Sequence, residues 1–376
     1  MQRLLISAGG TGGGVYPALA VAEALRQTSS ASNGAPLALH YIGSIGGMER
    51  DLIQRAGDLF ASYDEVQAGP LHGVSAGRVV ISTAKLTVGI LQTLRLIARY
   101  RPQALFLTGG WVTFPVALAC RVRNIPIAIF LPDIEPGLAI KVLSRLARVI
   151  YATTADSAAY FPAGKVIETG YPLRANVLNA KREDAFGHFQ LDASRHTLLV
   201  FGGSRGARSI NEAFGAIVSD VLDDGLQVIH ISGELDWSAV QARRTALPAD
   251  QQARYHVYPY LHGDMGLALA AADLVVSRAG ASTLGEFPQF GLPAILVPYP
   301  FAWRYQKVNA DWLAARGAAI RLNDEAMRAE LLPTIRALFA DPAHLAVMRE
   351  KAAALAHPEG AAMLAQRLIA IDRTTI

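Results

Sequence analysis

Short apolar runs that end in glycine alternate with stretches of helical spacing along the first half of the chain. Arg3 to Ala8 is such a run and Ala104 to Thr108 is another, and each leads directly into glycines. Runs of this kind are typical of strands buried on both faces of a parallel sheet. Leu86 to Tyr100 instead places its apolar residues at helical spacing. The alternation predicts an α/β fold with helices on both faces of a parallel sheet.

The other expected elements of this half follow the same plan. A helix is predicted from Ala18 to Gln27, with Pro17 at its start, where proline is tolerated. A glycine turn over residues 9–14 precedes that helix. Further strands are predicted at Leu37 to Ile42, Ile127 to Leu131 and Val166 to Glu168.

The second half of the chain repeats the first. TLLVFGGSRGA at 197–207 resembles RLLISAGGTGG at 3–13, and Gly291 to Leu296 resembles Asn124 to Ile129. Similar halves predict two Rossmann-like domains whose parallel sheets face an interdomain cleft.

The length of 376 residues agrees with two domains at roughly 150 residues each. We place the first at residues 1–170 and the second at 171–355. The segment 356–376 holds a helical pattern, and we expect it to pack back on the first domain.

Composition narrows the class of protein. With 52% hydrophobic and 18% charged residues, the chain is not of the disordered type. The single cysteine, Cys120, excludes a disulfide scaffold and a cysteine-based zinc site. There is no uninterrupted run of about 18 apolar residues, and the N-terminus does not read as a signal peptide. We therefore expect a cytoplasmic protein without a membrane span.

Positive charge is concentrated in one block. Residues 78–150 contain ten Lys or Arg and only two acids, although the net charge of the whole chain is +4. This favours an anionic partner such as a lipid surface. Apolar residues lie among these cations: Leu86, Ile90, Leu94, Ile97, Leu138, Leu143 and Leu146. Two interpretations stay open, a membrane contact and ordinary core packing, and we favour core packing for most of these side chains.

Four glycine-rich turns follow predicted strands, at residues 9–14, 109–110, 202–207 and 278–285. Glycine lets backbone N–H groups approach a phosphate closely, and a following helix adds positive potential. Any one turn can be purely structural, but four together favour a phosphate-bearing ligand. The phosphate-loop glycines we single out are Gly10, Gly12, Gly13, Gly203 and Gly206.

Several familiar signatures are missing. The chain has no P-loop motif, no G-x-G-x-x-G loop, no D-x-D motif and no cluster of metal-ligand spacing. His256 and His262 flank an expected strand end, and we interpret them as structural. We expect no metal, no cofactor and no nucleic acid partner, so that arginine, hydroxyls and helix dipoles would meet any phosphate charge.

Four polar residues have both a plain and a functional interpretation. Arg174, near the proposed domain junction, is either a solvated charge or a ligand of a pyrophosphate. Glu286 is either a solvated acid in the first turn of a helix or the acceptor of two ribose hydroxyls. Gln306 and Asn309 share a helix face and either contact a sugar or lie on the surface.

The ordered motifs resemble the MurG family of peptidoglycan glycosyltransferases, which add N-acetylglucosamine to lipid I. Gly9 to Gly13 followed by Pro17 to Ala22 is similar to the opening of that family. The later similarities come in the same order, at Gly109–Val112, Gly202–Ala207, Arg278–Glu286 and Gly291–Ala294. The resemblance runs from about residue 3 to about residue 320 and implies a GT-B fold.

By position, the resemblance implies a UDP-N-acetylglucosamine site in the second domain. Arg174 and Ser204 would hold the pyrophosphate, Leu261 would lie by the uracil, and Glu286 would take the ribose hydroxyls. Thr11 and Trp111 would line the acceptor side of the first domain, with His72 a further candidate there. Ser282 and Thr283 would face the phosphates, and Tyr305, Gln306 and Asn309 would lie at the sugar.

The chain departs from the family pattern at three places. Gly14 stands where the family usually has histidine, and Tyr305 replaces the first of two glutamines. Phe130 to Asp133 stands where the family has a His-Glu-Gln-Asn stretch. The departures fall mainly on the acceptor side.

The family reaction is a direct, inverting displacement that needs a base for the acceptor hydroxyl. Asp133 is our candidate base, with Glu135 in reserve and His72 as a further alternative. Thr11 is a further catalytic candidate. An aspartate at this place is also a common turn residue.

The resemblance therefore implies an inverting, metal-independent transfer from UDP-N-acetylglucosamine to a polyprenyl-pyrophosphate-linked acceptor, lipid I, to give lipid II. The protein would bind peripherally at the inner face of the cell membrane. The alternatives are a GT-B transferase with another lipid or small-molecule acceptor, a UDP-N-acetylglucosamine 2-epimerase, and an impaired homologue that only binds the UDP-sugar.

Overall fold

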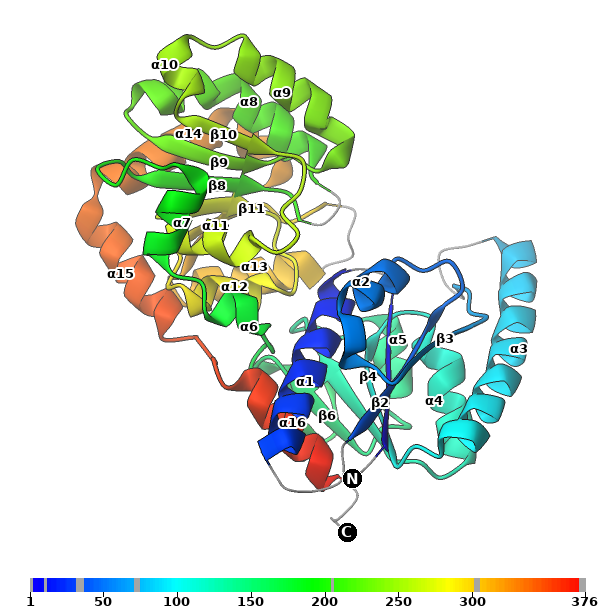
Figure 1. The fold of residues 1–376 in the computed structure, drawn as a ribbon. Helices are drawn as coiled ribbons and strands as arrows, with labels where there is room; N and C mark the ends of the chain where they lie inside the picture. Colours follow the sequence, from blue (N-terminus) through cyan, green and yellow to red (C-terminus); the bar gives the residue numbers. More distant parts are fainter. Residues whose placement is uncertain are drawn as a thin grey trace. The chain divides into compact units, whose positions relative to one another are not determined.

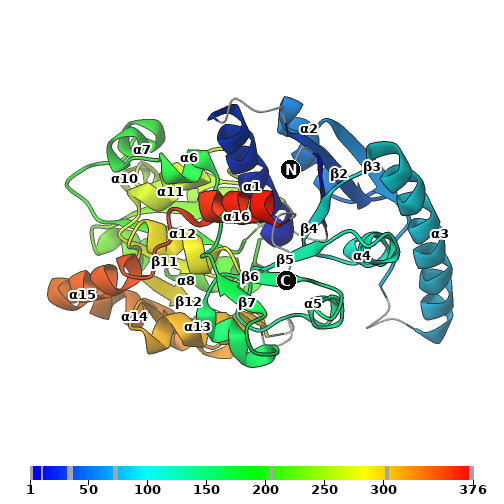
Figure 2. The ribbon, with the colours of Figure 1, turned by 90° about the horizontal axis from the view of Figure 1, so that it is seen from below.

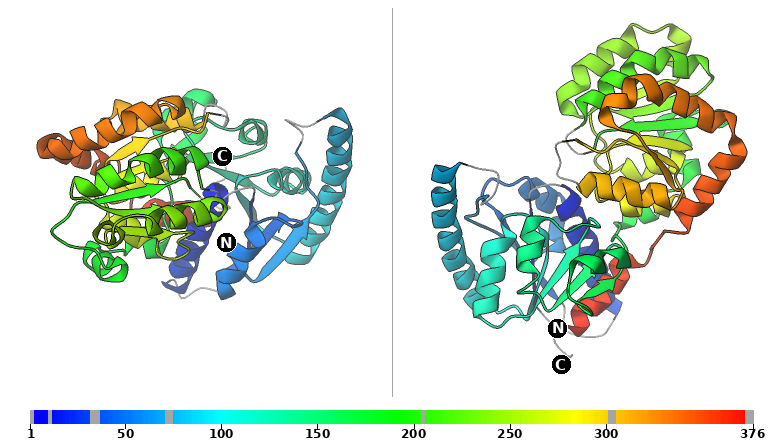
Figure 3. Two further views of the ribbon diagram at one scale, coloured as in Figure 1. Left: turned by 90° about the horizontal axis from the view of Figure 1, so that it is seen from above. Right: turned by 180° about the vertical axis from the view of Figure 1, so that it is seen from behind.

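The computed structural model describes residues 3–9, 12–31, 37–70, 75–203, 206–300 and 305–371. The chain forms two compact units, each with its own parallel sheet (Figures 1 and 3). Unit 1 comprises Met1–Arg174 and Pro358–Ile376, and unit 2 comprises Ala175–His357. The fold class expected from the sequence, two Rossmann-like α/β domains, is confirmed.

The described residues of unit 1 form a seven-stranded sheet in the order β3-β2-β1-β4-β5-β6-β7. Each pair of neighbouring strands is parallel. Three of the predicted strands, those that begin at Arg3, Ile127 and Val166, have the expected bounds. The strands are β1 (Arg3–Ala8), β2 (Ala38–Ser44), β3 (Ser62–Val66), β4 (Ala104–Gly109), β5 (Ile127–Leu131), β6 (Val149–Ala152) and β7 (Val166–Glu168).

Helices cover both faces of this sheet. Helix α3 packs on α4 and α4 on α5, while α1 packs on the C-terminal helix α16, beside which it lies in Figure 2. The helices of unit 1 are α1 (Gly12–Ala31), α2 (Glu49–Arg55), α3 (Ala76–Tyr100), α4 (Thr113–Val122), α5 (Leu138–Leu143) and α16 (Gly360–Ala370), with 3₁₀ turns η1 (Gly57–Leu59) and η2 (Ala155–Tyr160).

Helix α1 begins earlier than the sequence suggested. The expected turn over residues 9–14 is wrong in its second half, because Gly12 already opens the helix. Pro17 consequently lies inside α1 and not at its start. Proline has no N–H, so the carbonyl of Gly13, four residues earlier, loses its intrahelical donor. The hydroxyl of Tyr171 donates to that Gly13 carbonyl at 3.5 Å and compensates for the loss.

Unit 2 repeats the architecture with a six-stranded parallel sheet, in the order β10-β9-β8-β11-β12-β13. Its strands are β8 (Thr197–Phe201), β9 (Gln227–Ile231), β10 (Tyr255–Tyr258), β11 (Leu274–Ser277), β12 (Ala294–Leu296) and β13 (Ala319–Arg321). Its helices are α6 (Ala175–Leu178), α7 (Arg182–Phe189), α8 (Arg208–Asp223), α9 (Trp237–Thr245), α10 (Ala249–Gln252), α11 (Met265–Ala271), α12 (Thr283–Gln289), α13 (Tyr305–Ala315), α14 (Met327–Ala340) and α15 (Pro342–Ala353), with 3₁₀ turns η3 (Glu234–Asp236) and η4 (Asp324–Ala326).

Helix α3 shows which of its apolar residues belong to the core. Leu86 and Ile97 are buried, and Ile90 and Leu94 pack against the same core. The core interpretation is confirmed for these four residues, and a membrane contact through them is wrong. A different stripe of α3 is exposed.

The same helix approaches the end of β3 closely. Gln92 Oε1 accepts a hydrogen bond from the backbone N–H of Gln67 at 2.8 Å. A Cβ at Gly89 would lie 2.1 Å from the Gln67 carbonyl oxygen. Glycine is therefore required at position 89 by close packing.

Gly89→Ala should lower the free energy of unfolding by about 2 kcal/mol, because helix α3 must move away from the Gln67 carbonyl. The matched control is Gly187→Ala on α7, where an added Cβ meets nothing within 4 Å. That control should leave stability unchanged or raise it by about 0.5–1 kcal/mol. Urea unfolding of both variants measures the difference, and equal midpoints would contradict the packing argument.

Candidate functional site

In each unit the strand order reverses between two neighbouring strands, β1 and β4 in unit 1 and β8 and β11 in unit 2. Ligands of open α/β sheets bind outside the carboxyl ends of the strands at such a point. The four glycine-rich segments predicted from the sequence follow these four strands. The tertiary structure thus pairs them, two in each unit.

The two loops of unit 1 touch through their backbones. Gly9 N donates to the Gly109 carbonyl at 3.2 Å. Gly110 has a φ of +91°, and a Cβ there would lie 2.5 Å from the Gly9 carbonyl oxygen. Only glycine permits this approach, so the loop glycines are required by the packing of the two loops.

In unit 2, the glycines of the loop after β8 also lie too close to neighbouring atoms to carry a side chain. A Cβ at Gly202 would meet Ala207 N at 2.2 Å, and one at Gly206 would meet the Ser232 carbonyl oxygen at 2.6 Å. Gly203 and Gly206 both have positive φ, at 88° and 73°. The loop leads into α8, whose first amides lie at the reversal point.

A buried arginine that the sequence analysis did not single out ties the second loop of unit 2 to its neighbours. Arg278 directly follows β11, and its Nη2 donates to Ser209 Oγ at the start of α8, at 2.6 Å. Its Nη1 forms an ion pair with Asp324 and donates to the Val297 carbonyl at 3.1 Å. Ser209 Oγ also donates to Asp324 Oδ1 at 3.0 Å. One guanidinium therefore joins the ends of β11 and β12 to α8 and η4.

Asn309 and Gln306 contact backbone atoms near the same loop. Asn309 is 0% exposed, and its Nδ2 donates to the Ala279 carbonyl at 3.1 Å. The interpretation of Asn309 as a surface residue is therefore wrong. Gln306 Oε1 accepts from Tyr299 N at 2.9 Å. Both side chains hold the loops that follow β11 and β12.

The other predicted donor residues follow strands at the same edge of the sheet. Thr283 is buried, and its hydroxyl donates to the Gly280 carbonyl at 2.7 Å. Ser282 immediately precedes α12, and Glu286 lies in its first turn, half-buried. Leu261 follows β10 and Tyr305 begins α13, both half-buried. Ser204 lies outside the described residues.

Arg174 is the last residue of unit 1. Its guanidinium lies over the ring of Tyr16 on α1, 4.3 Å from the ring centroid. This cation–π contact orients the side chain without neutralising its charge. Its predicted role towards a pyrophosphate stays a prediction.

The acceptor-side candidates of unit 1 are placed as follows. Trp111 is half-buried and stacks on Phe114, with ring centroids 5.9 Å apart. Asp133 is half-buried and follows β5. Glu135 is buried, and its Oε1 lies 3.6 Å from Lys141 Nζ. Gly12 and Gly13 open α1, whereas Gly10, Thr11 and His72 lie outside the described residues.

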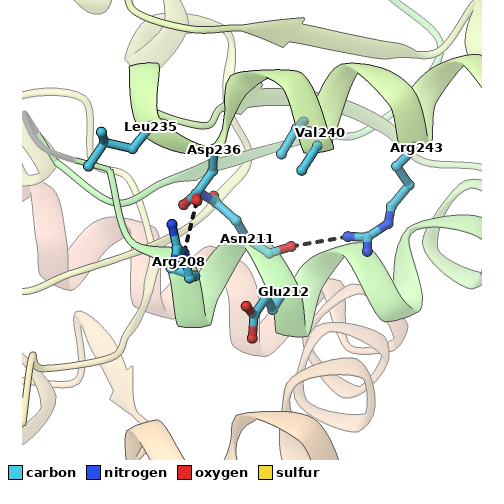
Figure 4. Close-up of a pocket in the computed structure, with 8 residues that line it drawn as sticks. Arg208, Asn211, Glu212, Leu235, Asp236, Val240 and Arg243 are labelled. Carbon is cyan, nitrogen blue, oxygen red and sulfur yellow. Dashed lines mark hydrogen bonds and ion pairs between the residues drawn. The ribbon is translucent and has the colours of Figure 1, made fainter.

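A hollow of about 280 Å³ lies between the start of α8 and the segment formed by η3 and α9 (Figure 4). Arg208 pairs with Asp236 at 3.1 Å across it, and Arg243 donates to the Asn211 carbonyl at 3.4 Å. None of the predicted donor residues lines this hollow. The lining residues are Arg208, Asn211, Glu212, Leu235, Asp236, Ala239, Val240 and Arg243.

Behind the hollow, Asn211 contacts a fully buried histidine. His230 Nε2 lies 2.9 Å from Asn211 Oδ1, and its Nδ1 lies 2.7 Å from the Tyr255 hydroxyl. Asn211 Oδ1 can only accept, so the neutral ring carries its proton on Nε2. Burial, with a smaller contribution from Arg243, lowers the pKa of His230 to about 3.

In the part of the chain that the structure describes, no group of three or more His, Cys, Asp or Glu is arranged to hold a metal ion. At the reversal points, the groups that can bind a ligand are the backbone of the glycine loops and the polar side chains next to them.

His230 should make stability fall on acidification. Between its ordinary pKa of about 6.5 and its folded value of about 3, the unfolded chain binds a proton that the folded chain does not. From about pH 6 to pH 4, this group alone should cost about 1.4 kcal/mol per pH unit.

Urea unfolding as a function of pH measures this slope. His230→Asn should remove it, whereas His344→Asn, at an exposed position on α15, should retain it. An unchanged slope in His230→Asn would show that other groups carry the pH dependence.

The comparisons with known proteins agree with this architecture. Residues 4–152 match the glycosyltransferase family 28 N-terminal domain, and residues 197–364 match the glycosyltransferase family 28 C-terminal domain. The chain is 39% identical over 416 residues to the UDP-N-acetylglucosamine--N-acetylmuramyl-(pentapeptide) pyrophosphoryl-undecaprenol N-acetylglucosamine transferase of Roseiflexus sp. (strain RS-1), covering 96% of this chain and 93% of that one.

Solved structures give the same picture. Acinetobacter baumannii MurG superposes with a TM-score of 0.76 at 28% identity, covering 99% of this chain and 100% of that one. The UDP-GlcNAc 2-epimerase of Neisseria meningitidis shares the fold alone, with a TM-score of 0.69 at 13% identity, covering 98% of this chain and 100% of that one. Because both halves match family 28 models and full-length relatives exceed 30% identity, the chain belongs to glycosyltransferase family 28 and, within it, to the MurG family of N-acetylglucosamine transferases.

Proposed function

We propose that this protein transfers N-acetylglucosamine from UDP-N-acetylglucosamine to the undecaprenyl-pyrophosphoryl N-acetylmuramoyl-pentapeptide, lipid I, and so forms lipid II. The observation that carries the proposal is the match of almost the whole chain to transferases named for this reaction. The pairing of glycine loops at the two reversal points supports it independently, because such points bind phosphate-bearing ligands.

The donor is proposed to bind at the carboxyl edge of the unit 2 sheet. Glu286 would accept the ribose hydroxyls, and the loop of Gly203 and Gly206 would present its amides to the diphosphate. Arg174 and Ser204 would add a guanidinium and a hydroxyl to the diphosphate. The interactions of Arg278 and Asn309 support this site because they fix the loops before a ligand binds.

Transfer is proposed to invert the anomeric carbon in one displacement, with no resident metal. The acceptor hydroxyl attacks the sugar carbon while the bond to the UDP oxygen breaks. Charge that grows on the leaving diphosphate would be stabilised by preplaced amides and by Arg174. The acceptor proton would pass to a carboxylate, for which Asp133 is the first candidate. Glu135 is a weaker candidate because it already pairs with Lys141.

A second candidate function keeps the donor and changes the acceptor. The observation in its favour is Gly14, which stands where the family usually has histidine. A Cβ at Gly14 would meet only ordinary contacts, 3.4 Å from Thr108 Oγ1 and 3.6 Å from the Gly9 carbonyl oxygen. Packing therefore does not force a glycine at this position. A different lipid or a small-molecule acceptor is consistent with such a change.

A lipid surface is proposed to bind the outer face of α3, α4 and α5, which we call the α3–α5 face. In the described part of the chain, exposed large apolar residues gather there: Ile81, Val88, Leu91, Leu118, Val122, Leu138 and Val142. Exposed cations lie among them, at Lys85, Arg95, Arg121, Arg123, Lys141 and Arg145, and these helices carry no acid.

This composition fits a peripheral contact with the anionic inner face of the cell membrane. Within the described residues, no helix combines the length and apolar character that crossing a bilayer requires. The α3–α5 face would bring the protein to an acceptor that is anchored in lipid.

Incubation with radiolabelled UDP-N-acetylglucosamine and a lipid I analogue should yield labelled disaccharide product. Asp133→Asn should lower kcat by 10²-fold or more with little change in the donor KM, because general base catalysis contributes about 10²–10⁴-fold. Transfer only to other acceptors would support the second candidate function. Absence of transfer to any acceptor, with UDP-sugar binding retained, would contradict both.

Co-sedimentation with vesicles should depend on anionic lipid and on the α3–α5 face. The double variant Ile81→Ser, Leu91→Ser should bind phosphatidylglycerol vesicles about tenfold more weakly, since partly burying two such side chains contributes a few kcal/mol at most. Leu91 is 56% exposed, and the matched control is Val347→Ser, which alters a 44% exposed residue on α15. Equal binding of the double variant and the control would end the membrane proposal.

A further inference from the structure

A fully buried carboxylate lies at the loops of unit 1 without a role in the site described above. Glu49, the first residue of α2, is 0% exposed. Its Oε1 accepts hydrogen bonds from the backbone N and the Oγ of Ser44, each at 2.6 Å. Its Oε2 is buried and has no hydrogen-bond partner. Among the described residues Glu49 makes no ion pair, so half of the carboxylate is unsatisfied.

Three glycines surround this carboxylate. A Cβ at Gly47 would lie 2.3–2.4 Å from its two oxygens and its Cδ. A Cβ at Gly43 would lie 2.9 Å from Glu49 Cγ, and one at Gly9 would lie 3.1 Å from Oε1. Side chains at positions 43 and 47 would therefore displace Glu49. We call Gly9, Gly43 and Gly47 the glycine cradle.

The cradle connects two parts of unit 1 that are distant in sequence. Gly43 and Gly47 belong to the end of β2 and the turn before α2, whereas Gly9 follows β1 at the reversal point. Gly9 in turn donates to the Gly109 carbonyl of the other acceptor-side loop. The Glu49 carboxylate thus lies beside Gly9, whose backbone is hydrogen-bonded to the second glycine loop of unit 1.

A neighbouring hydroxyl does not satisfy the second oxygen of Glu49. The Tyr41 hydroxyl donates to the Ala8 carbonyl at 2.8 Å, not to Glu49. Burial, followed by the charge of Glu49, raises the pKa of that Tyr41 hydroxyl. A buried polar atom without a partner is costly and rare, and each one in a folded protein calls for an explanation. Ordinary core packing would be served better by an apolar residue at position 49.

We infer that Glu49 is a positioning residue for the acceptor half of the reaction. Its carboxylate, held in the glycine cradle, sets the backbone of the Gly9 loop against the Gly109 loop and keeps an uncompensated oxygen beside them. This inference rests on the proposed function. It assigns Glu49 no contact with the reacting atoms.

Steady-state kinetics with UDP-N-acetylglucosamine and a lipid I analogue tests the inference with Glu49→Gln. The amide has the same size and keeps an oxygen for Ser44, but it removes the charge and places an NH₂ group at the unsatisfied position. We expect kcat/KM for the acceptor to fall about tenfold, with the donor KM and the urea midpoint unchanged. Asp51→Asn, an exposed acid on the same helix, is the matched control and should behave as wild type.

A double-variant cycle tests the positioning separately. Gly47→Ala should lower the acceptor kcat/KM by a similar factor, because its Cβ displaces the carboxylate. In Glu49→Ala the carboxylate is gone, so adding Gly47→Ala to it should cause little further loss. Additive losses would mean that the two residues act independently and would overturn the inference.

The remaining outcomes are also decisive. Wild-type kinetics in Glu49→Gln, or a loss of its fold, or equal losses for donor and acceptor, would each overturn the positioning role. Failure of the wild-type protein to transfer the sugar would instead refute the proposed function, so the two failures are distinguishable.

Discussion

The reversal of strand order in each sheet is the constraint on which the rest of this structure depends. Parallel strands must be joined by crossovers, and on either side of a reversal these run to opposite faces of the sheet. The loops after β1 and β4, and after β8 and β11, therefore diverge at the carboxyl edge of each sheet. The glycine loops and Arg278 lie at these edges, and so does the proposed diphosphate site.

Each unit has a buried charged side chain near its glycine loops, and the two side chains have opposite charges. Unit 2 uses a buried cation, Arg278, whose Nη atoms pair with Asp324 and bond to Ser209 and Val297, while its Nε is buried without a partner. Unit 1 uses a buried anion, Glu49, which is satisfied on one oxygen only. Each group leaves one buried polar atom unsatisfied, but Arg278 bonds to three different segments, whereas Glu49 bonds to Ser44 alone. The Arg278 network therefore fixes more of the surrounding structure than the Glu49 contacts do.

Much of the fold could be predicted from local pattern, because buried parallel strands are short apolar runs and the turns after them need glycine. The strands at Arg3–Ala8 and Ile127–Leu131 have the predicted bounds. The start of α1 was missed because three consecutive glycines read as a turn. Contacts of α1 with β1 and β4, together with the bond from Tyr171 to Gly13, support the helix there.

The sequence by itself determined the fold class, the family and the four glycine loops, since each depends on residues that are neighbours along the chain. It could not determine which side chains are buried together. That Arg278 joins four elements, that Asn309 holds the Ala279 carbonyl, and that Glu49 is enclosed by three glycines depends on contacts between distant segments. The tertiary structure decided these roles, because burial and the supply of hydrogen-bond partners are set by packing and not by local spacing.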